Sequence, residues 1–309
     1  MAPVPLFSSV ETASLPPGPV HLAIGIFDGV HRGHRAVIEA AVRAAARDGG
    51  RAAVLTFRPH PSVVLRPDQP ARLILGAQTL AGILAELGIG AVITHPFTPE
   101  FAHMEAADFL PWLKRCLPRL AGVYVGRAWR FGRGRRGDVA VLEAAARPLG
   151  VAVVGAPAVV LDGEPVTSTR IRTCLESGEV AAANTLLGYC YFSEGRVAPG
   201  KRLGRTLGFP TLNLPWAPEL LPRFGVYRVR VRGGSSALPG IANYGLRPTV
   251  ERAVSPLLET HVLGSCPWGD GDPIRVEWVD FVRPELKFAS VEALREQIGR
   301  DIAAARAIL

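Results

Sequence analysis

Lysine is nearly absent from this chain, which has only Lys114, Lys201 and Lys287 among its 309 residues. The formal net charge of +8 therefore comes almost entirely from arginine. Arginine and alanine enrichment of this kind often reflects coding bias, so the charge alone does not indicate a nucleic-acid binder, and we expect no nucleic-acid partner. Anionic small molecules are a second interpretation, because the arginines gather in particular loops.

Long apolar runs and paired cysteines are also missing. No run is long enough to cross a bilayer, and no N-terminal segment has the basic and apolar regions of a secretory signal. The four cysteines form no CxxC pair and have no histidine beside them at zinc spacing. The sequence therefore predicts a cytoplasmic chain with ordinary thiols, without membrane association or an obligatory protein partner.

Apolar patterning, in contrast, is abundant, since 48% of the residues are hydrophobic. Short apolar runs alternate with alanine- and leucine-rich segments of helical spacing, as in a parallel α/β sheet. The expected strands are 20–27, 51–57, 89–97, 121–126 and 150–160. The expected helices are 34–50, 76–88, 106–117 and 139–150. This pattern predicts a doubly wound α/β domain over residues 1–184.

Near residue 185 the pattern changes to strands separated by glycine and proline, which is typical of an antiparallel β-barrel. These strands are expected at 225–234, 239–245, 257–263 and 274–282. An amphipathic helix is expected over 290–309, and 167–188 should be helical and connect the domains. The second domain is thus predicted over residues 185–309.

The first candidate site is "GIFDGVHRGH", residues 25–34. Gly25, Gly29 and Gly33 allow a tight turn and a close approach of phosphate, and the following helix offers its positive N-terminal end. His31 and His34 can donate to phosphate oxygens. From these residues alone, an anion site and a plain turn are about equally supported.

A second polar stretch, "TSTRIR" at 167–172, combines hydroxyl and guanidinium groups at the predicted start of a helix. Taken alone, an N-cap with surface arginines explains it better than a phosphate site. Together, however, the two stretches resemble the nucleotidylyltransferase superfamily, and the first has the form found in bacterial FAD synthetases. The resemblance implies that His31 and His34 bind ATP phosphates and stabilise charge at the α-phosphorus. It also assigns ATP or phosphate binding to Gly25, Phe27, Asp28, Gly29, Gly33, Ser168, Thr169 and Arg172.

Two further stretches concern the flavin. The loop "VGRAWRFGRGRRGD", 125–138, suits an anionic ligand, although a solvated basic loop explains most of its arginines. "FRPHP", 57–61, also matches the family, although a rigid turn explains it nearly as well. The resemblance implies that His60, Pro61, Arg130 and Phe131 bind flavin. The chain departs from the family pattern at Ala128, where a polar residue is usual.

The second half carries "GRVAPGKRLGRTLGFPTLNL", residues 195–214, in which glycines alternate with cations. It is not a P-loop, because the GxxxxGK[ST] arrangement is absent. Thr211 and Asn213 would share one face of a strand and could bind Mg²⁺ through oxygen atoms, although such residues are more often structural. Glu259 in an apolar strand is either a general base or the partner of an arginine in a salt bridge.

This order of motifs resembles the riboflavin kinase domain. The resemblance implies that Thr211 and Asn213 bind Mg²⁺ with ATP, and that Glu259 takes the proton from the riboflavin 5′-hydroxyl. It places Phe281 and Arg283 on the flavin side and assigns phosphate binding to Gly195, Lys201, Gly204 and Gly208. Leu212 replaces the usual alanine, which we expect to alter packing only.

Nearly the whole chain, residues 20–305, is therefore identified as similar to the bacterial bifunctional riboflavin kinase/FMN adenylyltransferases. The implied ligands are riboflavin, FMN, FAD and ATP as co-substrate, with Mg²⁺ as cofactor. The alternative is a riboflavin kinase whose adenylyltransferase domain is weakened or inactive because of Arg127, Ala128 and Trp129.

Overall fold

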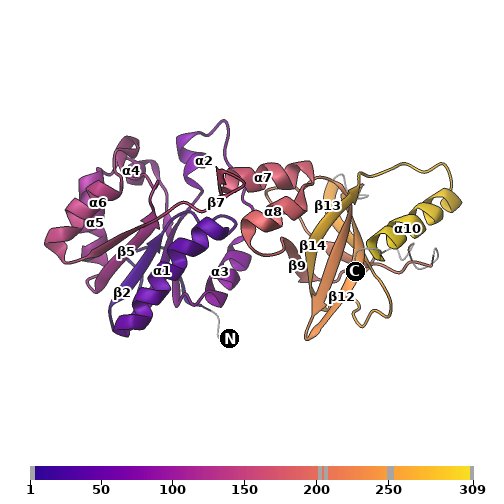
Figure 1. The fold of residues 1–309 in the computed structure, drawn as a ribbon, viewed down its shortest axis with the longest axis horizontal. Coiled ribbons are helices and arrows are strands. Elements are labelled where there is room, and N and C mark those ends of the chain that lie inside the picture. Colours follow the sequence, from indigo (N-terminus) through magenta and orange to yellow (C-terminus); the bar gives the residue numbers. More distant parts are fainter. Residues whose placement is uncertain (1–3, 201–203, 205–207, 249–253, 307–309) are drawn as a thin grey trace. The chain divides into compact units, whose positions relative to one another are not determined.

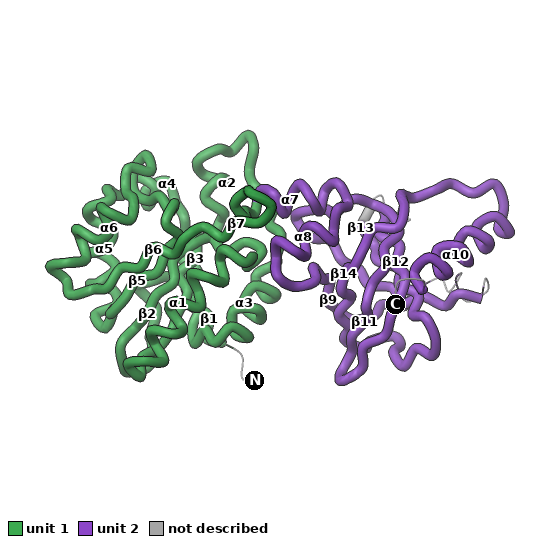
Figure 2. The backbone as a smooth tube through the Cα atoms, in the orientation of Figure 1, with its two compact units in different colours: residues 1–168 green, residues 169–309 purple. Residues whose placement is uncertain are grey.

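The computed structural model describes residues 4–200, 204, 208–248 and 254–306. The chain divides into two compact units, Met1–Ser168 and Thr169–Leu309, which are coloured separately in Figure 2. Lys201, which was predicted to bind phosphate, lies outside the described residues.

The first unit is built on a six-stranded parallel sheet (Figure 1). Its strands in spatial order are β1 (Leu6–Phe7), β4 (Ala91–Pro96), β3 (Arg51–Arg58), β2 (Val20–Ile24), β5 (Leu120–Gly126) and β6 (Ala152–Ala156). The five strands expected from the sequence are confirmed as β2 to β6. Strand β1 was not predicted, because two residues are too few to show a periodicity.

Helices cover both faces of this sheet, which is why its strands are apolar without alternation. They are α1 (Arg32–Asp48), α2 (Pro61–Leu65), α3 (Ala77–Glu86), α4 (Pro99–Ala102), α5 (Ala106–Cys116) and α6 (Val139–Ala146), with short 3₁₀ turns at Arg133–Arg135 and Arg147–Leu149. Helix α1 packs on β2, β3 and β5, whereas α6 packs against α5 and β6. The doubly wound α/β prediction is confirmed.

The strand order locates the edge at which a ligand binds. From β2 the chain runs outward through β3 to β4, and it then returns to place β5 on the other side of β2. The loops that follow β2 and β5 therefore leave the carboxyl edge of the sheet as neighbours, and such a switch point is the usual ligand site of this architecture.

The predicted helical connection consists of two helices, α7 (Ser168–Ser177) and α8 (Val180–Leu187). Gly178, with φ +87°, separates them, because a left-handed residue ends a helix and glycine adopts that conformation without strain.

The second unit is a six-stranded antiparallel sheet that curls into a nearly closed barrel (Figure 1). Its spatial order is β10 (Leu212–Pro215), β13 (Val254–Val262), β12 (Ser236–Pro248), β11 (Gly225–Gly233), β14 (Pro273–Arg283) and β9 (Phe192–Arg196). Past the end of β9, Ala198 bridges Asn213 of β10, and this bridge joins the two outer strands. Tyr227, Tyr244 and Trp278 fill the interior.

The C-terminal helix α10 (Val291–Arg306) is present as expected. Ser290 caps it, since its hydroxyl oxygen accepts the N–H of Ala293 at 3.2 Å. The barrel and its C-terminal helix confirm the predicted fold of the second domain. Among the described residues, no helix is both long and apolar enough to span a membrane.

Candidate functional site

The loop between β2 and α1 holds the first pair of candidate residues. His31 is the N-cap of α1, and its Nδ1 accepts the backbone N–H of His34 at 3.3 Å. The helix therefore begins two residues earlier than expected, at Arg32, because the histidine satisfies a backbone donor of the first turn. The two imidazole rings stack with their centroids 3.6 Å apart. Gly33 makes this stacking compatible with the helix, since a Cβ there would lie 3.2 Å from Cε1 of His31.

Phe27 packs against the His34 ring, and Gly25 packs against Phe27. The Phe27 ring is buried and meets the His34 ring edge-on, with centroids 5.4 Å apart. Gly25 lies against that ring, since a Cβ there would come within 3.1 Å of it. Phe27 and Gly29 both have positive φ angles, of 54° and 86°, which give the loop its sharp turn.

Asp28 fixes the loop to the rest of the unit. Its Oδ1 accepts the backbone N–H groups of Ile74 at 2.9 Å and Leu75 at 3.3 Å, and the residue is buried. Its backbone carbonyl accepts the hydroxyl of Ser168 at 2.9 Å. The structure thus brings the "FDGVHRGH" loop and the first residue of α7 together, as the two sequence stretches suggested.

Thr169 and Arg172 follow Ser168 on α7 and belong to the second compact unit. Thr169 is exposed and Arg172 half-buried within that unit. Their predicted role in phosphate binding stays a prediction.

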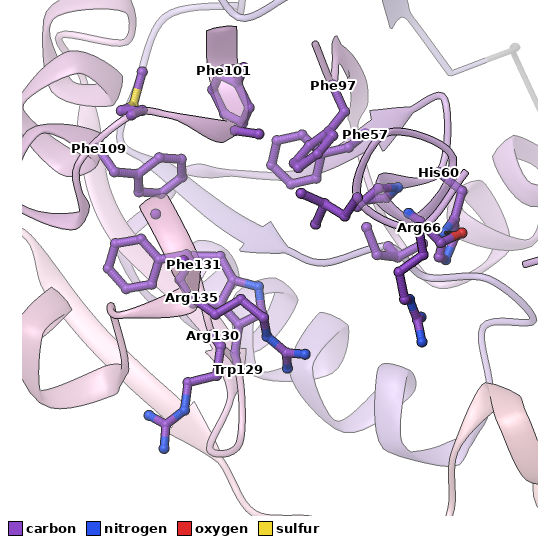
Figure 3. A pocket seen from close by; sticks show the side chains of 18 of the residues that line it. Phe57, His60, Arg66, Phe97, Phe101, Phe109, Trp129, Arg130, Phe131 and Arg135 are labelled. Atoms are coloured by element: carbon purple, nitrogen blue, oxygen red, sulfur yellow. Dashed lines mark hydrogen bonds between the residues drawn. The ribbon is translucent and has the colours of Figure 1, made fainter. Parts of the chain in front are cut away.

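Beside the loop lies a pocket of about 650 Å³ at the carboxyl edge of the sheet. Ile26, which directly precedes the "FDGVHRGH" loop, forms part of its wall. Figure 3 shows aromatic rings along the pocket and three guanidinium groups that extend away from the rings of Phe57, Phe97 and Phe101. The aromatic lining residues are Phe57, Phe97, Phe101, Phe109, Trp129 and Phe131, and the cationic ones are Arg66, Arg130 and Arg135.

The loop after β5 supplies the opposite wall, with Ala128 itself lining the pocket. The rings of Trp129 and Phe131 stack at 4.5 Å, inclined by 13°. Gly132 allows the loop to reach the start of α5, because a Cβ there would lie 2.7 Å from the backbone of Ala106. The pocket therefore offers flat aromatic surface beside Ala128, where this chain lacks the polar side chain that is usual in the family.

The arginines of this loop differ in their partners. Arg130 forms an ion pair with Asp138 at 3.0 Å, and the Val141 N–H and the Arg130 charge together lower the pKa of that carboxyl. Arg133 pairs with Glu105 at 3.3 Å, away from the pocket. Arg66 and Arg135 line the pocket without an ion pair to any described residue. The sequence pointed to Arg135 only as one of several arginines in a loop suited to an anionic ligand, and it gave no sign of Arg66, because nothing in its local pattern separates it from other surface arginines.

His60 and Pro61 lie at the start of α2 and line the same pocket. Nδ1 of His60 accepts the N–H of Ser62 at 3.1 Å and contacts its hydroxyl at 2.8 Å. The Ser62 oxygen in turn accepts the N–H of Ala71 at 2.8 Å, so its own proton points to Nδ1. A neutral His60 ring therefore carries its proton on Nε2.

The second unit brings its polar candidates together across three strands. Asn213 of β10 stands opposite Glu259 of β13, which in turn stands opposite Asn243 of β12. Directly opposed residues project from the same face of a sheet, so these three side chains form one row. Asn243, whose Nδ2 donates to Glu285 at 3.3 Å, was not singled out from the sequence, since only the strand register places it beside Glu259.

Two pockets flank this row. The first, of about 370 Å³, is lined by Thr211, Asn243, Glu259 and apolar residues of α10 such as Leu294 and Ile298. The second, of about 460 Å³, is lined by Thr211, Asn213, Gly200 and Trp268. Thr211 contributes to both pockets, so a ligand group held there can face either one.

The glycines that were predicted to bind phosphate in the second unit lie in different places relative to these two pockets. Gly204 lines the 370 Å³ pocket, and a Cβ there would clash with the Phe209 carbonyl oxygen. Gly208 has φ +88° in the turn that leads to Thr211. Gly195 lies in β9 opposite Ile274 and packs on Leu214; the described linings of these two pockets do not include it.

Arg283 and Phe281 lie on opposite faces of β14. A bulge pairs Arg283 with Val226 but Phe281 with the next residue, Tyr227. Arg283 lines the 370 Å³ pocket, where its Nε and Nη2 donate to the buried carboxylate of Asp301 at 3.0 and 2.7 Å. Phe281 instead lies under the Arg223 guanidinium, 4.7 Å away, and the described lining of that pocket does not include it.

Comparison with known proteins accounts for both halves. A family model for FAD synthetase matches residues 16–170, and one for riboflavin kinase matches residues 187–309. A bifunctional riboflavin kinase/FMN adenylyltransferase of Escherichia coli strain K12 is 38% identical over 287 residues, covering 92% of this chain and 91% of the relative. The Listeria monocytogenes protein of the same name is 34% identical over 285 residues, covering 91% and 89%.

A solved structure resembles the whole chain. It is a Streptococcus pneumoniae protein described as a macrolide-efflux protein, and it superposes with a TM-score of 0.86 at 26% identity. It covers 98% of this chain, and 99% of that protein is matched. Since the two family models together span most of the sequence and the relatives match over nearly their full lengths, the chain belongs to the family of bifunctional riboflavin kinase/FMN adenylyltransferases.

Proposed function

We propose that this chain makes FAD from riboflavin in two ATP-dependent reactions. The second unit transfers the γ-phosphoryl group of ATP to the riboflavin 5′-hydroxyl, which gives FMN and ADP. The first unit then joins the FMN phosphate to the α-phosphorus of a second ATP and releases pyrophosphate. We place the functional boundary between residues 184 and 185, within α8, so that the family-model matches fall on either side of it.

The observation that carries the adenylyltransferase half is the contact between the "FDGVHRGH" loop and Ser168 beside the aromatic pocket. The flat rings suit the isoalloxazine ring of FMN. The guanidinium groups of Arg66, Arg130 and Arg135 suit the FMN phosphate. His31 and His34 stand at the positive end of α1, where phosphate oxygens are stabilised. Phosphoryl-type transfers need donors held in place rather than a nucleophile from the protein.

The kinase half is supported by the row of Asn213, Glu259 and Asn243. Glu259 lines the 370 Å³ pocket together with apolar side chains such as Leu294 and Ile298, which suits a carboxylate that takes the proton of the flavin hydroxyl. The hydroxyl of Thr211 and the side-chain oxygen of Asn213 would hold Mg²⁺ together with ATP. Oxygen donors fit this ion, which retains waters and binds phosphates at the same time. When bound, it would neutralise charge on the transferred phosphoryl group.

The test is to incubate the protein with riboflavin, ATP and Mg²⁺ and to separate the flavins over time. We expect FMN to appear first and FAD to follow. FMN that never proceeds to FAD would overturn the bifunctional assignment in favour of a kinase alone. Asn213→Ala and Glu259→Gln should stop FMN formation while added FMN is still converted to FAD, and a loss of both reactions would contradict separate sites.

A further inference from the structure

The segment that carries Thr211 is not held by the regular sheet. Pairing between β10 and β13 runs from Leu212 opposite Thr260 to Pro215 opposite Leu257, and Thr211 precedes it. Pro210 has no backbone N–H, so it cannot donate a ladder hydrogen bond to β13. Its carbonyl instead accepts a hydrogen bond from Nδ1 of His261 at 2.8 Å. A side chain of β13 thus makes the connection beyond the end of the ladder.

Further contacts hold the segment 209–211 next to His261. The N–H of Phe209 donates to the Gly204 carbonyl at 2.7 Å, and a Cβ at Gly204 would lie 3.4 Å from the Thr211 methyl group. The Phe209 ring meets the His261 ring edge-on at 5.7 Å. Pro210 and Thr211 are therefore packed between Gly204 and the imidazole of His261.

The position of His261 on its strand relates it to the reacting groups. It lies two residues after Glu259, so both side chains project from the same face of β13. Glu259, His261 and Thr211 all line the 370 Å³ pocket. Because a carbonyl only accepts, Nδ1 of His261 must carry a proton, and this hydrogen bond sets the distance between the Thr211 segment and the strand of Glu259.

We propose that His261 is a positioning residue of the kinase reaction, which holds the Pro210 carbonyl and thereby places the Thr211 hydroxyl for the nucleotide and its divalent ion. This inference rests on the proposed function of the second unit. It assigns His261 no proton transfer and no contact with the reacting atoms. Its loss should therefore weaken nucleotide binding more than it slows the chemical step.

Two substitutions separate the hydrogen bond from the bulk of the ring. In His261→Asn the side-chain Nδ2 sits where Nδ1 was, and it can still donate to Pro210. In His261→Gln the donor is displaced by one bond length. A matched control is His103→Gln, since Nδ1 of His103 also contacts a proline carbonyl, that of Pro99 at 2.6 Å, but in the first unit.

The first measurement is binding of ADP with Mn²⁺, followed by the paramagnetic signal of the free ion, which needs no turnover. We expect His261→Gln to weaken binding roughly tenfold, as befits one lost hydrogen bond, and His261→Asn to stay within about threefold of the parent chain. The KM for ATP in FMN formation should rise in parallel while kcat changes less. FAD formation from added FMN and the His103→Gln control should match the parent chain.

Equal weakening in both His261 variants would show that ring packing matters rather than the hydrogen bond, and unchanged binding in His261→Gln would also overturn the proposal. If the parent chain binds ADP with Mn²⁺ but forms no FMN, the proposed kinase function fails and the positioning role is still decided by the binding data.

Discussion

His31 and His34 stack almost face to face, with 3.6 Å between the ring centroids and 17° between the ring planes. Nδ1 of His31 accepts the backbone N–H of His34, so a neutral His31 ring carries its proton on Nε2. One nitrogen of His31 therefore starts helix α1, and the other is a donor with a fixed direction. These two roles can be separated by mutation.

His31→Asn keeps the first role and removes the second. The asparagine oxygen can still cap α1, because asparagine is among the best N-cap residues. Loss of the Nε2 donor should lower the rate of FAD formation roughly 100-fold or more. FMN formation from riboflavin and the melting temperature should be those of the parent chain. Chromatography of the flavins and calorimetry check both, and a variant that made FAD normally would remove His31 from the reaction.

Arg66→Gln and Arg135→Gln should weaken FMN binding to the first unit. Each guanidinium lines the aromatic pocket without an ion pair to a described residue, so each can donate hydrogen bonds to the FMN phosphate. We expect a roughly tenfold rise in the Kd for FMN per substitution, and little change for riboflavin, which has no phosphate. Fluorescence quenching of the flavin measures both ligands. Arg133→Gln is the control, since Arg133 pairs with Glu105 outside the pocket lining; equal effects on FMN and riboflavin would argue against phosphate recognition.

Asp301→Asn should destabilise the second unit. The carboxylate is buried and accepts three hydrogen bonds from Arg283 and one from Gln297. Removing its charge leaves the Arg283 guanidinium without its counter-ion, which typically costs about 3–5 kcal/mol. Urea unfolding followed by tryptophan fluorescence should show the loss. Glu39→Gln breaks only the exposed pair with Arg43 and should cost less than about 1 kcal/mol. A similar effect of the two substitutions would mean that the buried pair does not hold α10.

His95 should make the first unit less stable as the pH falls. Burial lowers the pKa of this imidazole, and the nearby Glu11 only partly opposes the shift. Between the ordinary pKa of about 6.5 and the lower folded value, the unfolded chain binds a proton that the folded chain does not, so the free energy of unfolding decreases as the pH decreases. Thermal unfolding at pH 7.5 and pH 5 measures the difference.

The comparison variant is His95→Asn, which keeps an acceptor for the Val10 N–H but does not titrate. Its melting temperature should depend less on pH over the same range. An unchanged pH dependence would assign the effect to other groups.

The fold was predictable because most of its strands and helices have a recognisable local pattern of apolar residues. Buried parallel strands give continuous apolar runs, and amphipathic helices give a period of 3.6 residues, so β2 to β6 and α1 were expected close to their observed positions. The break between α7 and α8 was missed, because a single glycine in a helical pattern is often tolerated. The separation of Phe281 from Arg283 was also missed, since a bulge shifts the alternation of side chains without any mark in the sequence.

The sites were predictable only in part, for a related reason. The "FDGVHRGH" loop and the Thr211 segment are contiguous, and their residue types suggest their chemistry. The aromatic pocket is assembled from β3, the loop after β4, α4, α5 and the loop after β5, and each segment contributes one or two ordinary aromatic residues. Such a surface exists only after the chain has folded.

The bridge between Ala198 and Asn213 also bears on how the protein behaves at high concentration. Outer strands of a sheet expose unpaired backbone groups, and these groups can recruit the edge of another molecule. The bridge uses the backbone of Asn213, since its carbonyl accepts the Ala198 N–H at 2.8 Å. Side-chain substitutions at Asn213 therefore leave this protection against aggregation in place, and an inactive Asn213 variant should stay as monodisperse as the parent chain.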